Sequence, residues 1–201
     1  IVYVAVDKEF RGAIIISDKI KEDSYIAIKE FKRNHVEKVV MLTGDRENIS
    51  KSVAEKLNLD EYHAELLPQD KVSWVERLMT QKSIQGKLIF VGDGINDAPV
   101  LALSDIGVAM GGLGSDAAIE AADVVIMTDQ PSKIVDAILL SKKTMKIVKQ
   151  NIIFAIFIKI MVLILSAFGL ATMWAAVFAD VGVSILAILN ALRILRVKKQ
   201  F

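Results

Sequence analysis

The 201-residue sequence contains no cysteine, which excludes a disulfide framework, a zinc ribbon and a thiol nucleophile. It also lacks an excess of charge of either sign. Its formal net charge is +1, so no whole-chain argument favours nucleic acid as a partner. An initiator methionine and a signal-peptide pattern are absent as well, and Ile1–Val6 already has the composition of a strand. We therefore expect the chain to begin inside a larger protein.

Charge is nearly absent from residues 150–192, whereas residues 1–146 carry most of the charged side chains. Two apolar runs, residues 152–170 and 171–192, fill this region, and each is about long enough for one helical crossing of a bilayer. Basic residues flank both outer ends of the pair, namely Lys142, Lys143, Lys146, Lys149, Arg193, Arg196, Lys198 and Lys199. The positive-inside rule then predicts an integral membrane protein with residues 1–146 and the C-terminus in the cytoplasm. We expect this membrane to be the plasma membrane. The alternative, an apolar hairpin buried in a soluble protein, fits these lengths and flanks poorly.

The remainder of the chain alternates apolar strand-like runs with helical patterns, which predicts an α/β fold with a parallel sheet. The expected strands are residues 2–6, 13–17, 38–42, 62–64, 88–92, 106–110 and 124–127, the first two forming a hairpin. The expected helices are residues 24–33, 47–57, 68–78, 98–103, 115–121 and 132–150. Asp23 or Ser24 is expected to cap the first helix, and the last helix is expected to continue into the first membrane crossing.

The central stretch is Leu88–Asp97, a buried strand that runs into a turn rich in polar groups. Gly92 and Gly94 flank Asp93 and allow the backbone to turn sharply and to approach a ligand closely. Asp93 and Asp97 are hard oxygen ligands of the kind that Mg²⁺ prefers. The alternative is a plain turn in which Asp97 only caps the next helix.

Two other strand ends carry polar groups that complement this turn. Thr43 offers a hydroxyl and backbone amides to a phosphate oxygen, Lys71 offers a positive charge, and Asn96 offers an amide donor. A phosphoryl-transfer site needs such cations and donors together with a carboxylate-bound Mg²⁺. Taken singly, Thr43–Asp45 would also suit an ordinary turn, and Lys71 a solvated helix position.

These segments resemble motifs of one family. Thr43-Gly44-Asp45, Pro68–Lys71 and Gly92–Asp97 look like the second, third and fourth motifs of the haloacid-dehalogenase-type phosphorylation domain of P-type ATPases. Val108–Gly111 and Ala117–Asp123 are also similar to the segments downstream of the fourth motif in that family. By this resemblance Thr43, Gly44, Asp45, Lys71, Asn96 and Asp97 belong to the catalytic set, and Asp93 and Asp97 hold Mg²⁺.

The sequence departs from the family in one large respect, because the Asp-Lys-Thr-Gly-Thr segment that carries the phosphorylated aspartate is absent. The actuator-domain loop and most of the nucleotide-binding domain are also missing. The resemblance then implies that residues 1–12 end a nucleotide-binding domain, residues 13–146 continue a phosphorylation domain, and residues 147–201 form the last two membrane helices and a short tail. The actuator domain, the nucleotide-binding domain and the upstream membrane helices are the implied partners, ATP is the implied substrate, and the chain alone should be inactive.

Two ionisable residues interrupt the apolar runs. Lys159 lies near the middle of the first run and Asp180 about a third of the way along the second. Such groups are costly in a membrane and indicate a functional site. The two could pair with each other, or Asp180 could bind a cation that Lys159 balances, with Gly182 allowing close approach.

Asn151, Lys159 and Asp180-Val181-Gly182 are similar to the last two membrane helices of the heavy-metal branch that exports Zn²⁺, Cd²⁺ and Pb²⁺. The resemblance implies Asp180 as metal ligand, Lys159 as its charge partner, and Asn151 and Gly182 as lesser candidates. A carboxylate without Met or Cys also suits a divalent ion better than Cu(I). The alternatives are a membrane-anchored phosphatase of the haloacid-dehalogenase type and a non-catalytic membrane fragment or regulatory subunit.

Overall fold

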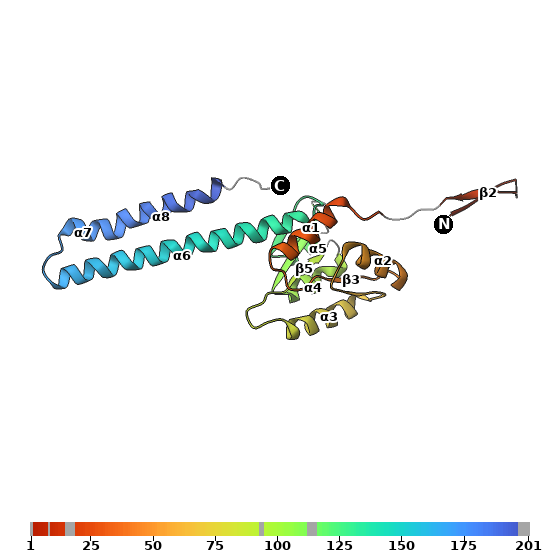
Figure 1. Ribbon diagram of the computed structural model, residues 1–201, viewed down its shortest axis with the longest axis horizontal. Coiled ribbons are helices and arrows are strands. Elements are labelled where there is room, and N and C mark those ends of the chain that lie inside the picture. Colours follow the sequence, from red (N-terminus) through yellow and green to blue (C-terminus); the bar gives the residue numbers. More distant parts are fainter. Residues whose placement is uncertain (1, 8, 15–18, 93–94, 112–115, 197–201) are drawn as a thin grey trace. The chain divides into compact units, whose positions relative to one another are not determined.

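The computed structural model describes residues 2–7, 9–14, 19–92, 95–111 and 116–196. The chain forms two compact units, Ile1–Lys133 and Ile134–Phe201. Figure 1 shows strands and short helices in the first unit and long helices in the second.

The first unit begins with an antiparallel hairpin of β1 (Val2–Val6) and β2 (Glu9–Ile14). The prediction placed the second strand at residues 13–17, which is wrong, because β2 begins at Glu9. The connection is shorter than the polar run suggested, with Asp7 in the left-handed backbone region at φ 52°. Residues 15–18 lie outside the described part of the chain.

The predicted parallel strands are confirmed, but they form two sheets rather than one. β3 (Val40–Leu42) pairs with β4 (Glu61–His63), and β5 (Ile89–Gly92) pairs with β6 (Ile106–Met110), which pairs with β7 (Val124–Ile126). Within the described residues, β3 has a ladder partner only in β4 and β5 only in β6. Each of these two strands therefore has one edge without a partner strand in the described part of the chain.

The helices lie between the strands as predicted. They are α1 (Glu22–Arg33), α2 (Glu47–Leu57), α3 (Pro68–Gln81), the 3-10 turn η1 (Ile95–Asp97), α4 (Ala98–Leu103) and α5 (Asp116–Ala121). Pro68 opens α3, where its fixed φ suits the first turn and its missing N–H costs no hydrogen bond.

The core of the first unit lies around α4 and β6. Val100 and Leu101 on α4 are fully buried, and each such side chain contributes about 1.5–3 kcal/mol relative to exposure. Gly107 allows this packing, because a Cβ there would lie 2.6 Å from the Leu101 carbonyl oxygen. The apolar sequence of α4 therefore sets the support for the polar turn that precedes it.

The predicted capping of the first helix by Asp23 or Ser24 is wrong. α1 begins at Glu22 without a side-chain cap. The Asp23 carboxylate instead accepts hydrogen bonds from Ser132 N at 2.8 Å and from Ser132 Oγ at 2.7 Å. A contact between residues so distant in sequence cannot be read from the local pattern, which is why the prediction failed.

The second unit is a helical hairpin. α6 (Ser132–Ala167) is one uninterrupted helix of 36 residues, about 54 Å long at 1.5 Å per residue. The returning arm consists of α7 (Met173–Val177), a π-helical turn (Phe178–Gly182), α8 (Val183–Ala191) and a 3-10 turn (Leu192–Arg196). Figure 1 shows the two arms running side by side, and Gly169, at φ 72°, lies in the turn between them.

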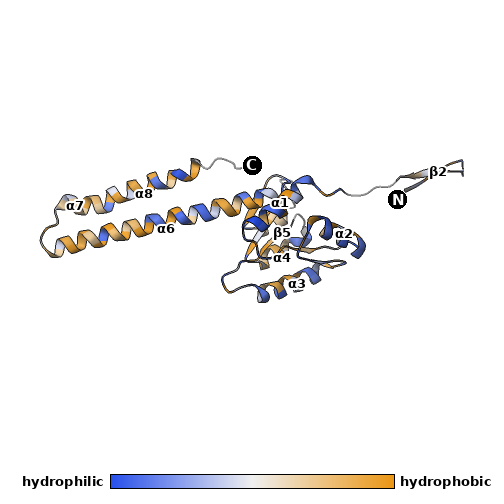
Figure 2. Cartoon of the chain, viewed as in Figure 1, coloured by the Kyte–Doolittle hydropathy of each residue, from blue (hydrophilic) through white to orange (hydrophobic). Residues whose placement is uncertain are grey.

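Both arms of the hairpin are apolar over much of their length, as Figure 2 shows. By length and composition, Ser132–Ala167 and Met173–Leu195 are each sufficient to cross a membrane. Their apolar windows are only 6% and 11% buried, so side chains such as Ile153, Leu163 and Ile188 stand exposed. A core helix of a soluble protein would bury these side chains, so the buried-hairpin alternative is not supported.

Candidate functional site

Thr43 directly follows β3 and is held by its backbone. Its N–H donates to the His63 carbonyl at 3.0 Å, and its carbonyl accepts from Leu66 N at 3.0 Å. Its hydroxyl donates to Asp45 Oδ2 at 3.0 Å and accepts from Asp45 N at 3.1 Å. Gly44 lies between them, and a Cβ there would lie 3.3 Å from the Leu66 carbonyl oxygen. Thr43, Gly44 and Asp45 therefore form a hydrogen-bonded turn at the carboxyl end of the strand, where parallel sheets place their ligands.

Lys71 lies in the first turn of α3. Its ammonium group binds Asp97 Oδ1 at 2.8 Å, and the two side chains are only 19% and 11% exposed. The alternative of a solvated lysine is therefore excluded. Asp97 occupies the position before α4 but makes no capping hydrogen bond, so the plain capping role is excluded too. The structure brings together a cation and a carboxylate that lie 26 residues apart in sequence.

Gly92, at the end of β5, is required by the position of Asp97. A Cβ at Gly92 would lie 2.7 Å from Asp97 Cβ and 2.9 Å from Asp97 Oδ2. The sequence predicted close approach to a ligand at this glycine. In the structure the close neighbour is the carboxylate of Asp97 itself.

The predicted metal ligand Asp93 lies outside the described residues, together with Gly94. Asn96 is exposed in η1, beside Asp97. Among the described residues there is no group of three or more acidic or histidine side chains placed to hold a metal. The donor chemistry of a carboxylate nevertheless suits Mg²⁺, which prefers hard oxygen ligands.

His63 and Trp74 connect the two halves of the site, and the sequence patterns pointed to neither of them. Their rings stack at 3.5 Å with an interplanar angle of 19°, and the Arg77 guanidinium lies 5.1 Å from the Trp74 ring centroid. His63 is the residue whose carbonyl binds Thr43, and Trp74 lies one helical turn after Lys71. The stack therefore links β4, which binds the Thr43 backbone, to α3, which carries Lys71.

Acidic side chains stabilise the two parallel sheets through hydrogen bonds and ion pairs. Asp105 accepts a hydrogen bond from Leu88 N at 2.9 Å and pairs with Lys82 and Lys87. These contacts lower the pKa of Asp105 from 3.8 to about 2. The hydrogen bond from the Leu88 amide has the largest effect, and the hydrogen bond from the Lys82 ammonium group has the next largest. These contacts fix the start of β5, the strand that leads to Gly92.

On the neighbouring sheet, Glu61 binds Lys38 and His63, and these bonds lower the pKa of its carboxyl, Lys38 having the larger effect. The hydrogen bond to Glu47 raises the pKa of the Tyr62 hydroxyl, because it favours the protonated phenol.

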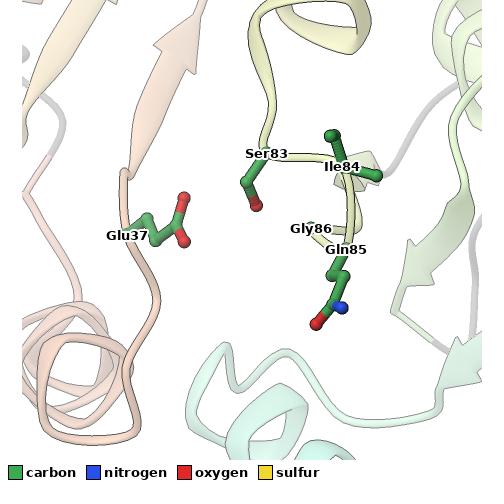
Figure 3. Close-up of a pocket in the computed structure, with 5 residues that line it drawn as sticks. All are labelled: Glu37, Ser83, Ile84, Gln85 and Gly86. Atoms are coloured by element: carbon green, nitrogen blue, oxygen red, sulfur yellow. The ribbon is translucent and has the colours of Figure 1, made fainter.

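A cavity of about 430 Å³ is lined by Glu37 and by residues Ser83 to Gly86, which Figure 3 shows as sticks. Its lining includes none of the predicted site residues that the structure describes. The charged group in this lining is a carboxylate, which would repel a phosphoryl group. The Thr43 turn and the Lys71–Asp97 pair are the better candidates for phosphoryl chemistry, because they offer a hydroxyl and an ammonium group.

In the second unit, Lys159 and Asp180 form an ion pair, with Lys159 Nζ 3.4 Å from Asp180 Oδ1. The two side chains are 58% and 78% exposed in this chain. Asp180 lies in the π-helical turn, in which one extra residue re-aims the side chains. The space beside Gly182 is filled by the ring of Phe178, because a Cβ at Gly182 would lie 2.5 Å from that ring.

Residues 2–105 match the family model of haloacid dehalogenase-like hydrolases. The match covers half of the sequence, so the chain belongs to this family.

Curated relatives match nearly the whole chain. The sequence is 58% identical over 200 residues to the cadmium, zinc and cobalt-transporting ATPase of Bacillus subtilis (strain 168), covering 100% of this chain and 28% of that protein. It is 58% identical over 194 residues to the zinc-transporting ATPase of Synechocystis sp. (strain ATCC 27184 / PCC 6803 / Kazusa), covering 96% and 27%. The chain thus spans about a quarter of the length of these relatives. The predicted resemblance to heavy-metal P-type ATPases is confirmed.

Solved structures agree. A crystal structure of a zinc-transporting PIB-type ATPase in the E2.Pi state matches with a TM-score of 0.85 and 38% identity, covering 96% of this chain and 31% of that one. The cobalt-bound deoxy-D-mannose-octulosonate 8-phosphate phosphatase of Haemophilus influenzae matches with a TM-score of 0.54 and 18% identity, covering 69% and 83%. The latter likeness shows the fold alone, and it confirms the predicted haloacid-dehalogenase-like architecture.

Proposed function

We propose that the chain is part of an ATP-driven exporter of Zn²⁺, Cd²⁺ or Pb²⁺. In that protein it supplies one wall of the phosphoryl-transfer site and two membrane-crossing helices. The observation that carries this proposal is the likeness to metal-transporting ATPases, which extends over the whole chain, its apolar helices included. A shared soluble domain alone would not require the second unit to match.

In the phosphoryl site, Thr43 binds a phosphoryl oxygen through its hydroxyl, and Lys71 neutralises the transferring group. Gly44 and Asp45 hold the Thr43 turn, and Asp97 orients the Lys71 ammonium group through their 2.8 Å contact. Mg²⁺, when bound, neutralises phosphate charge, and Asp93, Asp97 and Asn96 are the residues assigned to its side of the site.

The phosphorylated aspartate comes from another part of the same protein. The open edges of β3 and β5 support this, because a strand between them would join the two sheets into one. The carboxyl end of such a strand would lie close both to the Thr43 turn and to Asp97. The nucleotide-binding domain, the actuator domain and the upstream membrane helices complete the pump, and the isolated chain is inactive.

In the membrane, α6 and the α7–α8 arm span the bilayer, with residues 1–146 and the C-terminus in the cytoplasm. α6 exceeds the ~30 Å hydrocarbon core, so its N-terminal part extends beyond it. Asp180 binds the transported cation, and Lys159 balances the carboxylate when the cation has left. The lesser candidates, Asn151 and Gly182, are occupied by contacts of the helices themselves.

A membrane-anchored phosphatase is not favoured. The likeness to phosphatases is at the level of the fold, and that function leaves the ion pair on the apolar helices without a purpose. A non-catalytic subunit is not favoured either, because the relatives carry the same segments within transport enzymes.

Phosphorylation of the full-length protein that contains this chain tests the proposal. Labelled ATP should give an acid-stable phosphoenzyme that hydroxylamine removes, as an acyl phosphate requires. Asp180→Ala should abolish the Zn²⁺ stimulation of ATP turnover. Asp129→Ala, which removes an exposed carboxylate of the soluble unit, should not. A protein that forms no phosphoenzyme, or an Asp180→Ala variant with normal Zn²⁺ stimulation, would contradict the proposal.

A further inference from the structure

Two asparagines join the arms of the helical hairpin. Asn151 of α6 donates from Nδ2 to the Ala187 carbonyl at 3.1 Å, and its Oδ1 accepts from Asn190 Nδ2 at 2.8 Å. Arg193 then donates to Asn190 Oδ1 at 2.9 Å. The amides form a directed chain that starts at Arg193 and ends on the backbone of α8. We call Asn151 and Asn190 the amide clasp.

The clasp lies on the face by which the two arms meet. Helical spacing places Asn151 on the same face of α6 as Ala155 and Ile158, and these three positions are less exposed than their neighbours. On the other arm, Ala187 and Asn190 are similarly half-buried. In a membrane, a side-chain hydrogen bond across such a face joins helices.

The amide clasp and the Lys159–Asp180 ion pair both form in one antiparallel register of the two arms. Asn151 lies eight residues before Lys159, and Ala187 lies seven residues after Asp180. The two contacts are therefore separated by about 12 Å along one arm and about 11 Å along the other. If the arms slipped by one turn, about 5.4 Å, the Asn151 amide would leave its partners and Lys159 would move away from Asp180.

The apolar side chains between the arms cannot prevent such a slip by themselves. Leucine, isoleucine and alanine side chains meet equivalent neighbours after one turn, and lipid gives no hydrophobic penalty for the exchange. Directional amide hydrogen bonds distinguish the two registers, because a displaced Asn151 or Asn190 would leave half-buried polar atoms without these partners.

We propose that Asn151 and Asn190 are positioning residues that hold the two arms in the register in which Lys159 faces Asp180. This rests on the proposed role of Asp180 and assigns Asn151 a task other than metal ligation. The polar groups that face the clasp are the Ala187 carbonyl and the Arg193 guanidinium. The clasp therefore acts on the cation site from a distance, through helix position.

The test uses the full-length protein that contains this chain. Asn151→Leu and Asn190→Leu should each raise the Zn²⁺ concentration for half-maximal ATP turnover by roughly threefold to fifteenfold, the range that one interhelical hydrogen bond supports. The double variant should match Asn151→Leu, because that substitution already breaks both bonds of Asn151, whereas Asn190→Leu leaves the bond to the Ala187 carbonyl in place. Thr144→Val is the matched control, since the Thr144 hydroxyl bonds within α6, to the Leu140 carbonyl. It should leave the Zn²⁺ dependence unchanged.

A direct measurement of register separates positioning from general stability. Met145 and Ile185 are exposed, and their positions are offset along the two arms. Each can be replaced by a keto-bearing residue that takes a nitroxide label without cysteine chemistry. Pulsed electron spin resonance should give one distance in the parent protein. In Asn190→Leu it should give a second distance, which differs from the first by up to about one turn, roughly 5 Å.

The outcomes decide between the alternatives. A single unchanged distance in both leucine variants would overturn the proposal. A second result would also overturn it. If Asn151→Asp bound Zn²⁺ more tightly while Asn190→Leu left the Zn²⁺ dependence of ATP turnover unchanged, Asn151 would be a direct ligand. Unchanged Zn²⁺ stimulation in Asp180→Ala would remove the proposed cation site instead, and the label distances would still report whether the clasp sets the register.

Discussion

The molecule contains two lysine–aspartate pairs whose surroundings differ. Lys71 and Asp97 lie 2.8 Å apart with side chains 19% and 11% exposed, whereas Lys159 and Asp180 lie 3.4 Å apart and are 58% and 78% exposed. The first pair is enclosed by packed strands and helices. The second is supported by the two arms of the hairpin, so its surroundings in the membrane depend on the rest of the protein.

The difference shows how environment assigns a role to the same two residue types. The packing around Lys71 and Asp97 prevents both groups from turning to water, so the positions of these two charges are fixed. A pair on apolar helices has a high cost of separation in lipid, and a bound cation can replace the lysine as the partner of the carboxylate. One pair is therefore suited to constant charge and the other to exchange.

The largest expected effect comes from exchanging the charges of the membrane pair. The double variant Lys159→Asp with Asp180→Lys keeps an opposite-charge pair, so the protein should reach the membrane fraction at normal levels. Zn²⁺ stimulation of ATP turnover should be lost, because the carboxylate has moved to the other arm. Membrane-fraction immunoblots and ATPase assays check both. Retained stimulation would mean that the position of the carboxylate is unimportant.

Lys71→Met should lower ATP turnover by roughly 100-fold to 1000-fold, as expected for removing one fixed charge from a transferring phosphoryl group. The matched control on the same helix is Ser73→Ala, whose hydroxyl bonds to the Gln69 carbonyl within α3. Steady-state turnover with saturating Zn²⁺ checks the prediction. A loss of less than about tenfold would show that Lys71 does not contact the reacting group.

Gly92→Ala should destabilise the first unit by about 1–3 kcal/mol, because the added Cβ would overlap Asp97. Gly107→Ala is a matched control, since its Cβ would overlap the Leu101 carbonyl at 2.6 Å, away from Lys71. Both variants should lower the unfolding temperature, but only Gly92→Ala should also impair turnover at permissive temperature. Equal activity of the two variants would disprove the coupling of Gly92 to the ion pair.

The smallest expected effect is a pH dependence of stability from Asp105. Its pKa is lowered from 3.8 to about 2, so its stabilising contribution is complete above the usual carboxyl pKa and is lost as the pH falls toward 2. The difference in unfolding temperature between the parent protein and Asp105→Asn should therefore shrink between about pH 4 and pH 2. Glu76→Gln, on the exposed face of α3, is the control. A constant difference across this range would contradict the assignment.

Local pattern predicted several elements residue for residue, among them Glu47–Leu57, Ala98–Leu103 and Ile106–Met110. Each has a short apolar period and clear ends. The hairpin strand Glu9–Ile14 was misplaced because a single residue in the left-handed region shortened the turn. The capping role of Asp23 failed for another reason, because its partner, Ser132, lies 109 residues away.

The sequence by itself determined the chemistry available to this protein. It specified the absence of thiols, the polar strand ends, the two apolar runs and the one charge inside each run, because residue type and local period suffice for these. Only the tertiary structure decided which groups meet. It placed Lys71 on Asp97, the His63–Trp74 stack between the two halves of the site, and Asn151 between Ala187 and Asn190. Such contacts depend on the register and packing of distant segments, which no local pattern encodes.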